Sequence, residues 1–463
     1  MIGIVGALAL GSTLLIGGSA RRESGKGKQG GTDDEGKIWT SGHKIERFDI
    51  IPLEEGGDFI NMLGQVMFVK YYEDVIDAAI HVEVLISDTY GWLNEAPIRS
   101  GCPVNLTISH PSSEEPFTYD IKEEPLVITN ISDHMIDNKR EVYTLTLETR
   151  SAISNHTTRV WKKYIDKIST TVNNVLTEVL EIEPDRIVNI EKTWNKCEFT
   201  GNFRRPFKII SKLCPKAIPE SADSSSPEDG SAGFLFWETI DGYNFASIDT
   251  LFSEEPEFSY EMTPYKEGAN AENNFQVSSN PQWEESHDIL KKLRSGAYRT
   301  ANWYFDILSR QPKFAEYNYM KSVEKGQSKT ANDPEGIPGF ESGFTDKYSR
   351  IILSTIDQGT MTPDVDGDGA TTPQDSALFQ AQASARYSSL FSQILHITIP
   401  MNLSLRAGDV LNIKFSELNT EDKDGGRNTE SGKYMIARLS HEFGNPKGDF
   451  TGLSLVRDSF QSK

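Results

Sequence analysis

Two different periods of apolar residues predict the main elements of this chain. Apolar and polar residues alternate in residues 81–92 and 142–150, which is typical of strands with one buried face. Between residues 160 and 182 the apolar residues recur every three or four positions, which predicts an amphipathic helix. The apolar positions of this predicted helix are Trp161, Ile165, Ile168, Val172, Val175 and Val179.

Strand-like and helix-like patterns of apolar residues also occur in the second half of the chain. Residues 234–252 contain two aromatic runs around the pair Asp241–Gly242, a strong signal for a β-hairpin. Residues 284–308 begin with a helical pattern and end in an aromatic, strand-like one, and residues 376–395 predict a further helix.

Three strands are predicted near the C-terminus. Residues 396–415 open with strict alternation, and Pro400 within them predicts an edge or a bulge because proline cannot donate to a ladder. Residues 432–443 and 450–460 complete an antiparallel set. The apolar face of the first strand carries Ile397, Ile399, Met401, Leu403 and Leu405.

The N-terminus carries an apolar run with no charge before Arg21. A secretory signal has its positive charges before the apolar run rather than after it. The run is just long enough for a membrane helix, but five glycines interrupt it and suit close packing against other apolar chains. A cleaved signal, a membrane anchor and a tail packed against a partner all stay open. The Gly- and charge-rich residues that follow predict a flexible linker.

Composition narrows the function classes. The 463 residues carry a formal net charge of -21, which argues against sequence-specific nucleic-acid binding, because nucleic-acid binders are usually basic. The three cysteines, Cys102, Cys197 and Cys214, show no CxxC spacing and predict neither a disulfide framework nor a zinc site. Cys102 is expected to be a small core residue.

One short stretch, DVDGDGATTPQDS at residues 364–376, has the spacing of a calcium-binding loop. Calcium takes six to eight hard oxygen ligands, which carboxylates, carbonyls and water can supply. A glycine at the sixth loop position, Gly369, allows the sharp turn, and Asp replaces the usual closing Glu. We expect a single, unpaired Ca2+ site rather than a sensor, leading directly into the helix from Ser376. The expected ligands are Asp364, Asp366, Asp368, Ala370, Thr372 and Asp375.

Catalytic signatures are absent from the sequence. The eight histidines are scattered, and His81 and Glu83 share a strand face without forming part of an HExxH motif. We expect His81 to be a surface or interface histidine with its bonds satisfied. No GxSxG elbow and no distinctive carboxylate pair stands out. The sequence therefore predicts a protein that is not an enzyme.

Several segments in a fixed order resemble the central baseplate hub proteins of contractile phage tails, the T4-type hub family, which is related to the spike proteins of type VI secretion. Residues 78–108 look like its first tube-barrel segment, and residues 143–180 look like the strand and helix that follow. The most diagnostic piece is residues 233–252, with the pattern F-x-F-x-E-x-x-x-G-[FY]-x-F-x-S-[IL]. Residues 405–415 and 431–443 resemble the closing barrel strands.

This resemblance implies a mainly β fold with α+β insertions, built from two tube-like antiparallel β-barrel domains and smaller mixed domains. It implies a homotrimer in which three chains supply six tube-like modules, and so adapts three-fold to six-fold symmetry. The implied partners are a spike protein below and a tail tube or tube-initiator protein above, with a tape-measure protein as a further candidate. The implied location is the tail baseplate of a virion assembled in the host cytoplasm.

The expected domain order follows from the same segments. Residues 1–40 form the apolar segment and linker, 41–150 the first barrel, and 151–232 a helix-containing α+β domain. Residues 233–283 together with 396–463 form the second barrel, and 284–395 form a mixed insert that carries the calcium-type loop. A rival reading stays open: a secreted or membrane-anchored, calcium-dependent carbohydrate-binding module or enzyme, supported by the N-terminal run and the dockerin-like loop.

Overall fold

The computed structural model describes most of the chain after residue 41, all of it within the compact unit Ile38–Lys463. The described residues are 42–53, 59–96, 98–120, 124–137, 139–220, 231–262, 274–276, 281–285, 288–306, 310–326, 328–332, 347, 350–355, 373–415, 430–445 and 448–459.

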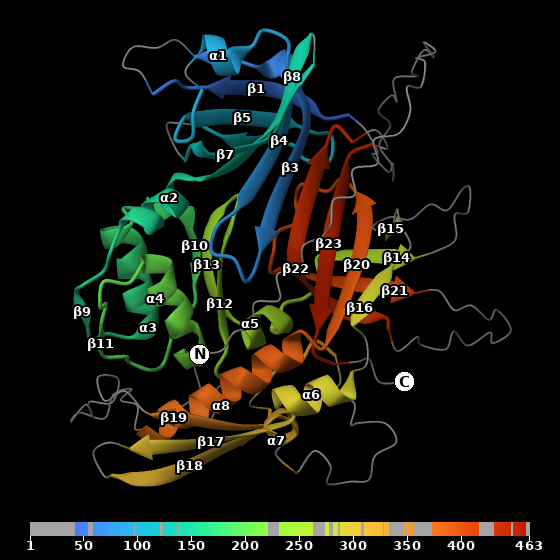
Figure 1. Ribbon diagram of the computed structural model, residues 1–463. Helices are drawn as coiled ribbons and strands as arrows, with labels where there is room; N and C mark the ends of the chain where they lie inside the picture. The colour runs from blue at the N-terminus through green and yellow to red at the C-terminus, as the bar shows by residue number, and fades with distance from the viewer. Residues whose placement is uncertain are drawn as a thin grey trace, which may run out of the picture. The chain divides into compact units, whose positions relative to one another are not determined.

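The protein is mainly β, with α+β insertions, as the sequence predicts (Figure 1). Within the described residues, fifteen strands form one hydrogen-bonded sheet. Its N-terminal strands are β1 (Lys44–Ile50), β2 (Ile60–Asn61), β3 (Val66–Asp74), β4 (His81–Asp88), β5 (Pro103–Ser109), β6 (Phe117–Tyr119), β7 (Leu126–Asp137) and β8 (Arg140–Thr149). Its C-terminal strands are β14 (Phe258–Met262), β15 (Asn274–Gln276), β16 (Gln282–Glu285), β20 (Gln393–Pro400), β21 (Val410–Phe415), β22 (Gly432–Phe443) and β23 (Phe450–Arg457).

The two halves of this sheet meet where β22 pairs antiparallel with β3. The order is β15-β14-β21-β22-β3-β4-β8-β7-β5-β1-β2, with β23, β20 and β16 branching from β22, and β6 pairing with β5. At the seam, Nε of Arg438 lies 2.5 Å from Oδ2 of its partner Asp74. One hydrophobic core continues across both halves and includes Tyr71 from β3 and Leu439 from β22.

The alternating patterns locate the strands accurately. Val82, Val84 and Ile86 of β4 are fully buried, as the alternation predicts. β22 spans the predicted residues 432–443, and β23 begins at the predicted Phe450. β20 ends at Pro400, although the buried alternation continues beyond the strand as far as Leu405. Proline thus ends the ladder, while the next residues still fill the core.

The helix predicted for residues 160–182 is wrong in its first third. The helical stretch is α3 (Ile168–Asn174), continued by the π-helical turn η2 (Val175–Val179), and its apolar face is buried as predicted. Residues before it are extended instead, because Val160 bridges to Arg204 and the short strand β9 (Lys163–Tyr164) pairs with β11 (Phe199–Thr200). Trp161, at a predicted apolar position, is 71% exposed. Here pairing between distant residues overrides the helical period.

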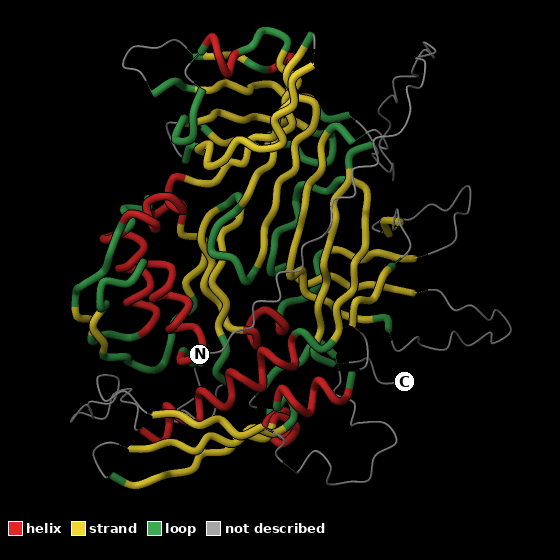
Figure 2. The backbone as a smooth tube through the Cα atoms, viewed as in Figure 1, coloured by secondary structure: helices red, strands yellow, loops and turns green. Residues whose placement is uncertain are grey.

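A second group of elements packs beside the large sheet. It comprises α2 (Arg150–Thr157), α3, η2, η3 (Pro184–Arg186), β10 (Ile187–Ile190), α4 (Pro206–Leu213), η4 (Cys214–Lys216), β12 (Phe234–Thr239), β13 (Gly242–Ser247) and α5 (Ile248–Ser253). The predicted hairpin is present as β12–β13, but its third neighbour is β10, in a separate three-stranded sheet. Aromatic residues of the hairpin share one core with α3 and α4. Figure 2 shows α2, α3 and α4 gathered on one side of the strands.

The predicted helix-then-strand in residues 284–308 is confirmed as α6 (Ile289–Ser295) and β17 (Arg299–Asp306). β17 lies between β18 (Gln311–Asn318) and β19 (Arg350–Thr355), followed by α7 (Tyr319–Glu324) and α8 (Pro373–Leu390). The predicted helix at 376–395 is α8, which ends five residues early because β20 begins at Gln393 and pairs with β23. The helix α8 packs on one face of the β17–β18–β19 sheet (Figure 1).

The short helices α1 (Trp92–Glu95) and η1 (Leu63–Gln65) complete the elements of the described part. None of the helices in that part has both the length and the hydropathy required to cross a membrane. Cys102, Cys197 and Cys214 are all buried, which confirms Cys102 as a small core residue. The domain boundaries expected from the sequence stay a prediction.

Candidate functional site

The calcium-type loop lies almost entirely outside the described residues. Asp364, Asp366, Asp368, Ala370 and Thr372 belong to that undescribed stretch, and Asp375 is described only as a backbone position in the first turn of α8. Across the residues that are described, no group of three or more His, Cys, Asp or Glu side chains is placed to hold a metal ion. The calcium site therefore stays a prediction.

The aromatic motif at residues 233–252 forms a buried junction between the large sheet and the helical region. Its carboxylate, Glu238, is buried and accepts hydrogen bonds from Thr149 at the end of β8 (3.0 Å) and from the backbone N–H of Ile80 (3.3 Å). The guanidinium of Arg186 approaches its other oxygen to 3.5 Å. Burial raises the pKa of Glu238 to about 8, since desolvation disfavours the charged form and Arg186 only partly offsets it.

A second buried carboxylate, Glu73 of β3, holds the turn of the same hairpin. It accepts hydrogen bonds from the backbone N–H groups of Ile240 (3.0 Å) and Ala407 (2.8 Å) and from the hydroxyl of Tyr71 (2.7 Å). Burial raises the pKa of Glu73, although Arg406 opposes the shift. The hairpin turn is thus tied to both halves of the large sheet.

Three further motif positions have specific structural roles. Gly242 has φ 137°, and a Cβ there would lie 2.1 Å from the carbonyl oxygen of Arg186, so only glycine fits. The hydroxyl of Tyr243 hydrogen-bonds Ser151 at 2.7 Å. Ser247 caps α5 by accepting from the N–H of Thr250. The motif identified in the sequence therefore contributes close packing, a buried hydrogen bond and a helix cap to the fold.

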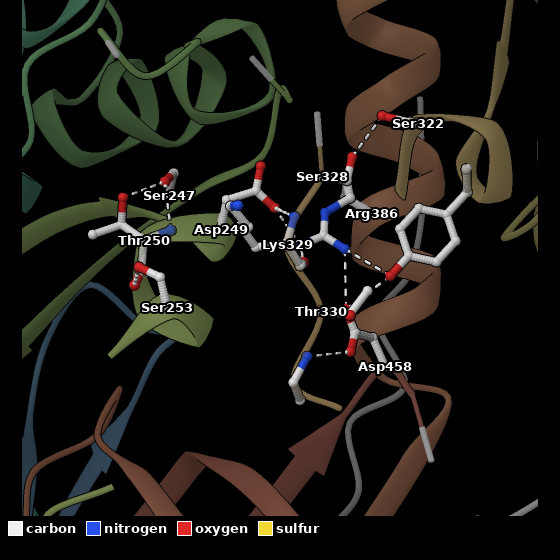
Figure 3. Close-up of polar contacts among 12 residues, drawn as sticks. Ser247, Asp249, Thr250, Ser253, Ser322, Ser328, Lys329, Thr330, Arg386 and Asp458 are labelled. Atoms are coloured by element: carbon white, nitrogen blue, oxygen red, sulfur yellow. Dashed lines mark hydrogen bonds and ion pairs between the residues drawn. The ribbon is translucent and has the colours of Figure 1, made fainter. Parts of the chain in front are cut away.

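Arg386 of α8 is the centre of a second buried polar cluster (Figure 3). It donates to Asp249 of α5 (2.7 Å), to Asp458 after β23 (3.0 Å) and to the carbonyl of Lys329 (2.8 Å). The hydroxyl of Tyr319 donates to Asp458 as well. Burial raises the pKa of Asp249 to about 6, with Arg386 acting in the opposite direction. This cluster fastens the insert to the C-terminal strand and to α5.

The face of the β17–β18–β19 sheet that α8 leaves uncovered carries a group of exposed apolar residues. Leu353 of β19 is 81% exposed and lies opposite Trp303 of β17, which in turn packs against Phe314 of β18 at 5.3 Å between ring centroids. Ile351 and Phe305 continue the face and are also exposed. Soluble monomers rarely expose contiguous apolar patches, and such patches mark contact surfaces.

The tip of the β7–β8 hairpin forms a second exposed apolar feature. The outer half of β7 is exposed, and Ile136 and Met135 near its end are 72% and 56% exposed. Among the described strands, the outer part of β7 pairs with β8 alone, and an edge strand of this kind is suited to pairing with another chain.

His81 is a satisfied surface histidine, as predicted. Its ring nitrogens lie 3.2 Å from Asp77 and 3.4 Å from Glu148. Hydrogen bonds to Asp77 and Glu148 raise the pKa of His81 to about 10. It lines an open hollow of about 690 Å³ between the β3–β4 turn, α2 and the start of α4.

Sequence reasoning found the motif hairpin but missed Arg386, the apolar sheet face and this hollow. Arg386 stands between apolar residues of α8, which was a usable signal for a buried charge. Arginine is rarely buried without partners, so a buried Arg386 also implies partners for its charge. The sheet face gave no signal, since exposed and buried apolar residues look alike in a strand pattern.

The fold is that of a mainly β protein with one continuous sheet, a helical region and a mixed insert. No protein-family model matches the chain, and no curated protein matches it in sequence. Solved structures do match it. A tail protein from Neisseria meningitidis MC58 aligns with 90% of this chain and 97% of its own length, at 9% identity and a TM-score of 0.53.

The 43 kDa tail protein of prophage MuSo2 from Shewanella oneidensis aligns with 89% of this chain and 99% of its own length, at 10% identity and a TM-score of 0.50. The chain therefore has the fold of these two tail proteins. The resemblance identified in the sequence is confirmed at the level of the fold.

Proposed function

We propose that this protein is the structural central hub of a contractile phage tail baseplate and has no catalytic activity. The observation that carries the proposal is the shared fold with phage tail proteins over about nine-tenths of the chain. The sequence motif supports it, since the buried carboxylate of Glu238 and the close backbone approach at Gly242 hold the sheet and helical regions together. The protein is proposed to lie in the virion tail baseplate after assembly in the host cytoplasm.

The proposed assembly is a homotrimer that joins a six-fold tail tube, or its initiator, to a central spike. Two exposed apolar features support contacts of this kind: the tip of β7–β8 around Ile136, and the sheet face around Leu353. Tape-measure protein is a further proposed neighbour. The formal charge of -21 suits a surface that does not bind a passing genome.

The trimer is tested by light scattering combined with size-exclusion chromatography over a hundred-fold concentration range. The expected mass is three times 51.8 kDa. The variants Ile136→Asp and Leu353→Asp test which apolar feature forms the contact between subunits. The matched control is Ile165→Asp, at a residue elsewhere that is 60% exposed. A monomer at every concentration would contradict the hub proposal, as would absence of the chain from the baseplate in a map of purified particles.

The Ca2+ site is proposed to stiffen the start of α8. The loop spacing of Asp364, Asp366 and Asp368 supports the ion, and Asp375 belongs to the first turn of α8. The buried Arg386 later in the same helix supports a structural role, because a well-anchored helix transmits order from the loop to the insert.

A further inference from the structure

The hollow of about 690 Å³ beside α2 and α4 is unusual in this acidic chain because its rim is basic. Arg159, Arg204, Arg205 and Lys208 line it together with His156. Within the described part of the chain, none of these four Lys and Arg side chains forms an ion pair with a carboxylate, and Arg159 donates only to the backbone carbonyls of His156 and Thr158.

The two carboxylates that also line the hollow do not neutralise this rim. Asp77 and Glu148 both lie against the ring of His81, at 3.2 and 3.4 Å. His81 holds its proton at neutral pH because its pKa is raised to about 10 by these two hydrogen-bonding partners. Protonated His81 cancels one of these two negative charges, so the net charge of three of the four basic side chains is left for a ligand.

The loop that presents Arg204 and Arg205 has a strained backbone. Asn202 and Phe203 have φ angles of 51° and 55°, which are uncommon for residues other than glycine and exceptional for a bulky aromatic one. Strain of this kind persists where the surroundings enforce it, and it gathers at ligand-binding positions. Here the enforcement comes from the bridge between Val160 and Arg204, with the N–H of Val160 donating to the carbonyl of Arg204 at 2.9 Å. At Gly201 a Cβ would lie 2.4 Å from the carbonyl oxygen of Val160.

The strained loop places an aromatic ring in solvent at the edge of the hollow. Phe203 is 71% exposed, and Ile76 on the β3–β4 turn, which also lines the hollow, is 60% exposed. A hollow of this volume suits a short ligand segment, with apolar contacts for affinity and a few charged groups for specificity.

We propose that this hollow binds a short acidic peptide segment of a partner protein, with the carboxylates on Arg204, Arg205 and Lys208 and an apolar side chain against Phe203 and Ile76. Guanidinium groups suit carboxylates because they donate two parallel hydrogen bonds. A polynucleotide suits the site less well, since the net charge of -21 repels a long polyanion that extends beyond the hollow. That the partner belongs to a tail assembly rests on the proposed function, whereas the chemistry of the site does not.

The test is fluorescence anisotropy of the full chain with a fluorescein-labelled peptide of Asp, Glu and one Phe. The expected result is saturable binding that weakens with salt, and at least ten-fold loss when Asn and Gln replace the acids. The double variant Arg205→Glu/Lys208→Glu should lower the affinity at least ten-fold. The double variant Lys192→Glu/Lys325→Glu, which changes the net charge equally at exposed positions outside the hollow, should change it less than two-fold.

Phe203→Ser separates the apolar contact from the charge. It should weaken binding several-fold while leaving the salt dependence unchanged. The proposal is overturned if the acidic peptide does not bind, if both double variants weaken it equally, or if an oligonucleotide of equal charge or inorganic phosphate binds more tightly than the peptide. Peptide binding is read on the isolated chain, so a monomeric result in light scattering would contradict the hub while leaving this site standing.

Discussion

Arg386 and Asp458, 72 positions apart in the sequence, form a buried ion pair with Nη1 and Oδ2 3.0 Å apart. Their side chains are 1% and 0% exposed. Because Asp249 lies on the other side of the guanidinium, one arginine compensates two buried carboxylates. This pair joins the insert to the end of the C-terminal strand.

Removing this arginine should destabilise the protein strongly. Arg386→Met leaves Asp249 and Asp458 buried without their cation, and the expected loss is about 3–5 kcal/mol of unfolding free energy. Arg386→Lys should lose less but cannot reproduce both contacts. Urea titration followed by tryptophan fluorescence measures the change.

The matched control is Arg299→Met, which removes an arginine from a pair with the half-exposed Glu316. Its expected cost is no more than about 1 kcal/mol, the range typical of solvated pairs. Equal losses for Arg386 and Arg299 would contradict the structural role of the buried cluster.

Gly242 should not tolerate a side chain. Gly242→Ala adds a Cβ 2.1 Å from a backbone oxygen at a φ of 137°, so the hairpin must shift, and the expected loss exceeds about 1 kcal/mol. Gly64→Ala, where a Cβ meets nothing within 4 Å, should be nearly neutral. Thermal unfolding by circular dichroism compares the two variants, and similar melting temperatures would refute the close approach.

Glu238 should make stability depend on pH. Its pKa is about 8 in the folded chain and near 4.5 when unfolded, so the folded state binds the proton more tightly. Stability from this group is fully present below about pH 4.5 and is lost as the pH rises to about 8, by at most about 1.4 kcal/mol per pH unit. His81 acts with the same sign between pH 6.5 and 10, and Asp249 between 3.8 and 6.

The variant Glu238→Gln isolates this contribution because glutamine keeps the neutral shape without titrating. Between pH 6 and 8, the wild-type protein should lose stability more steeply than the variant, as measured by urea unfolding at each pH. The exposed Glu83→Gln is the control and should follow the wild type. Parallel profiles for wild type and Glu238→Gln would exclude a raised pKa at this residue.

Calcium should raise the melting temperature if the proposed loop binds it. Ligand that binds only the folded state stabilises it by RT ln(1 + [L]/Kd), about 2.7 kcal/mol at a hundred-fold excess over Kd. EDTA should reverse the effect, and Asp364→Asn/Asp368→Asn should abolish it. The control Asp133→Asn/Asp137→Asn, at the β7–β8 tip, should retain it. If calorimetric titration with Ca2+ gives no heat of binding and Ca2+ does not raise the melting temperature, the loop is only a solvated turn.

The sequence by itself determined the parts of the fold whose information is local. Alternation of apolar and polar residues placed β4 and β8, and the Asp241–Gly242 pair placed the hairpin, because side-chain period and turn residues act over a few neighbours. The order of these segments was enough to predict a phage tail fold.

Only the tertiary structure decided which distant segments meet. It placed the hairpin beside β10, and it replaced the first turns of the predicted helix with a strand pairing across to residues 199–204. It also brought Arg386 to Asp249 and Asp458, and Ile76 and Arg159 to the hollow beside Phe203. The physical reason is that pairing energy and burial depend on partners far away in the chain. The local spacing of apolar residues does not identify those partners.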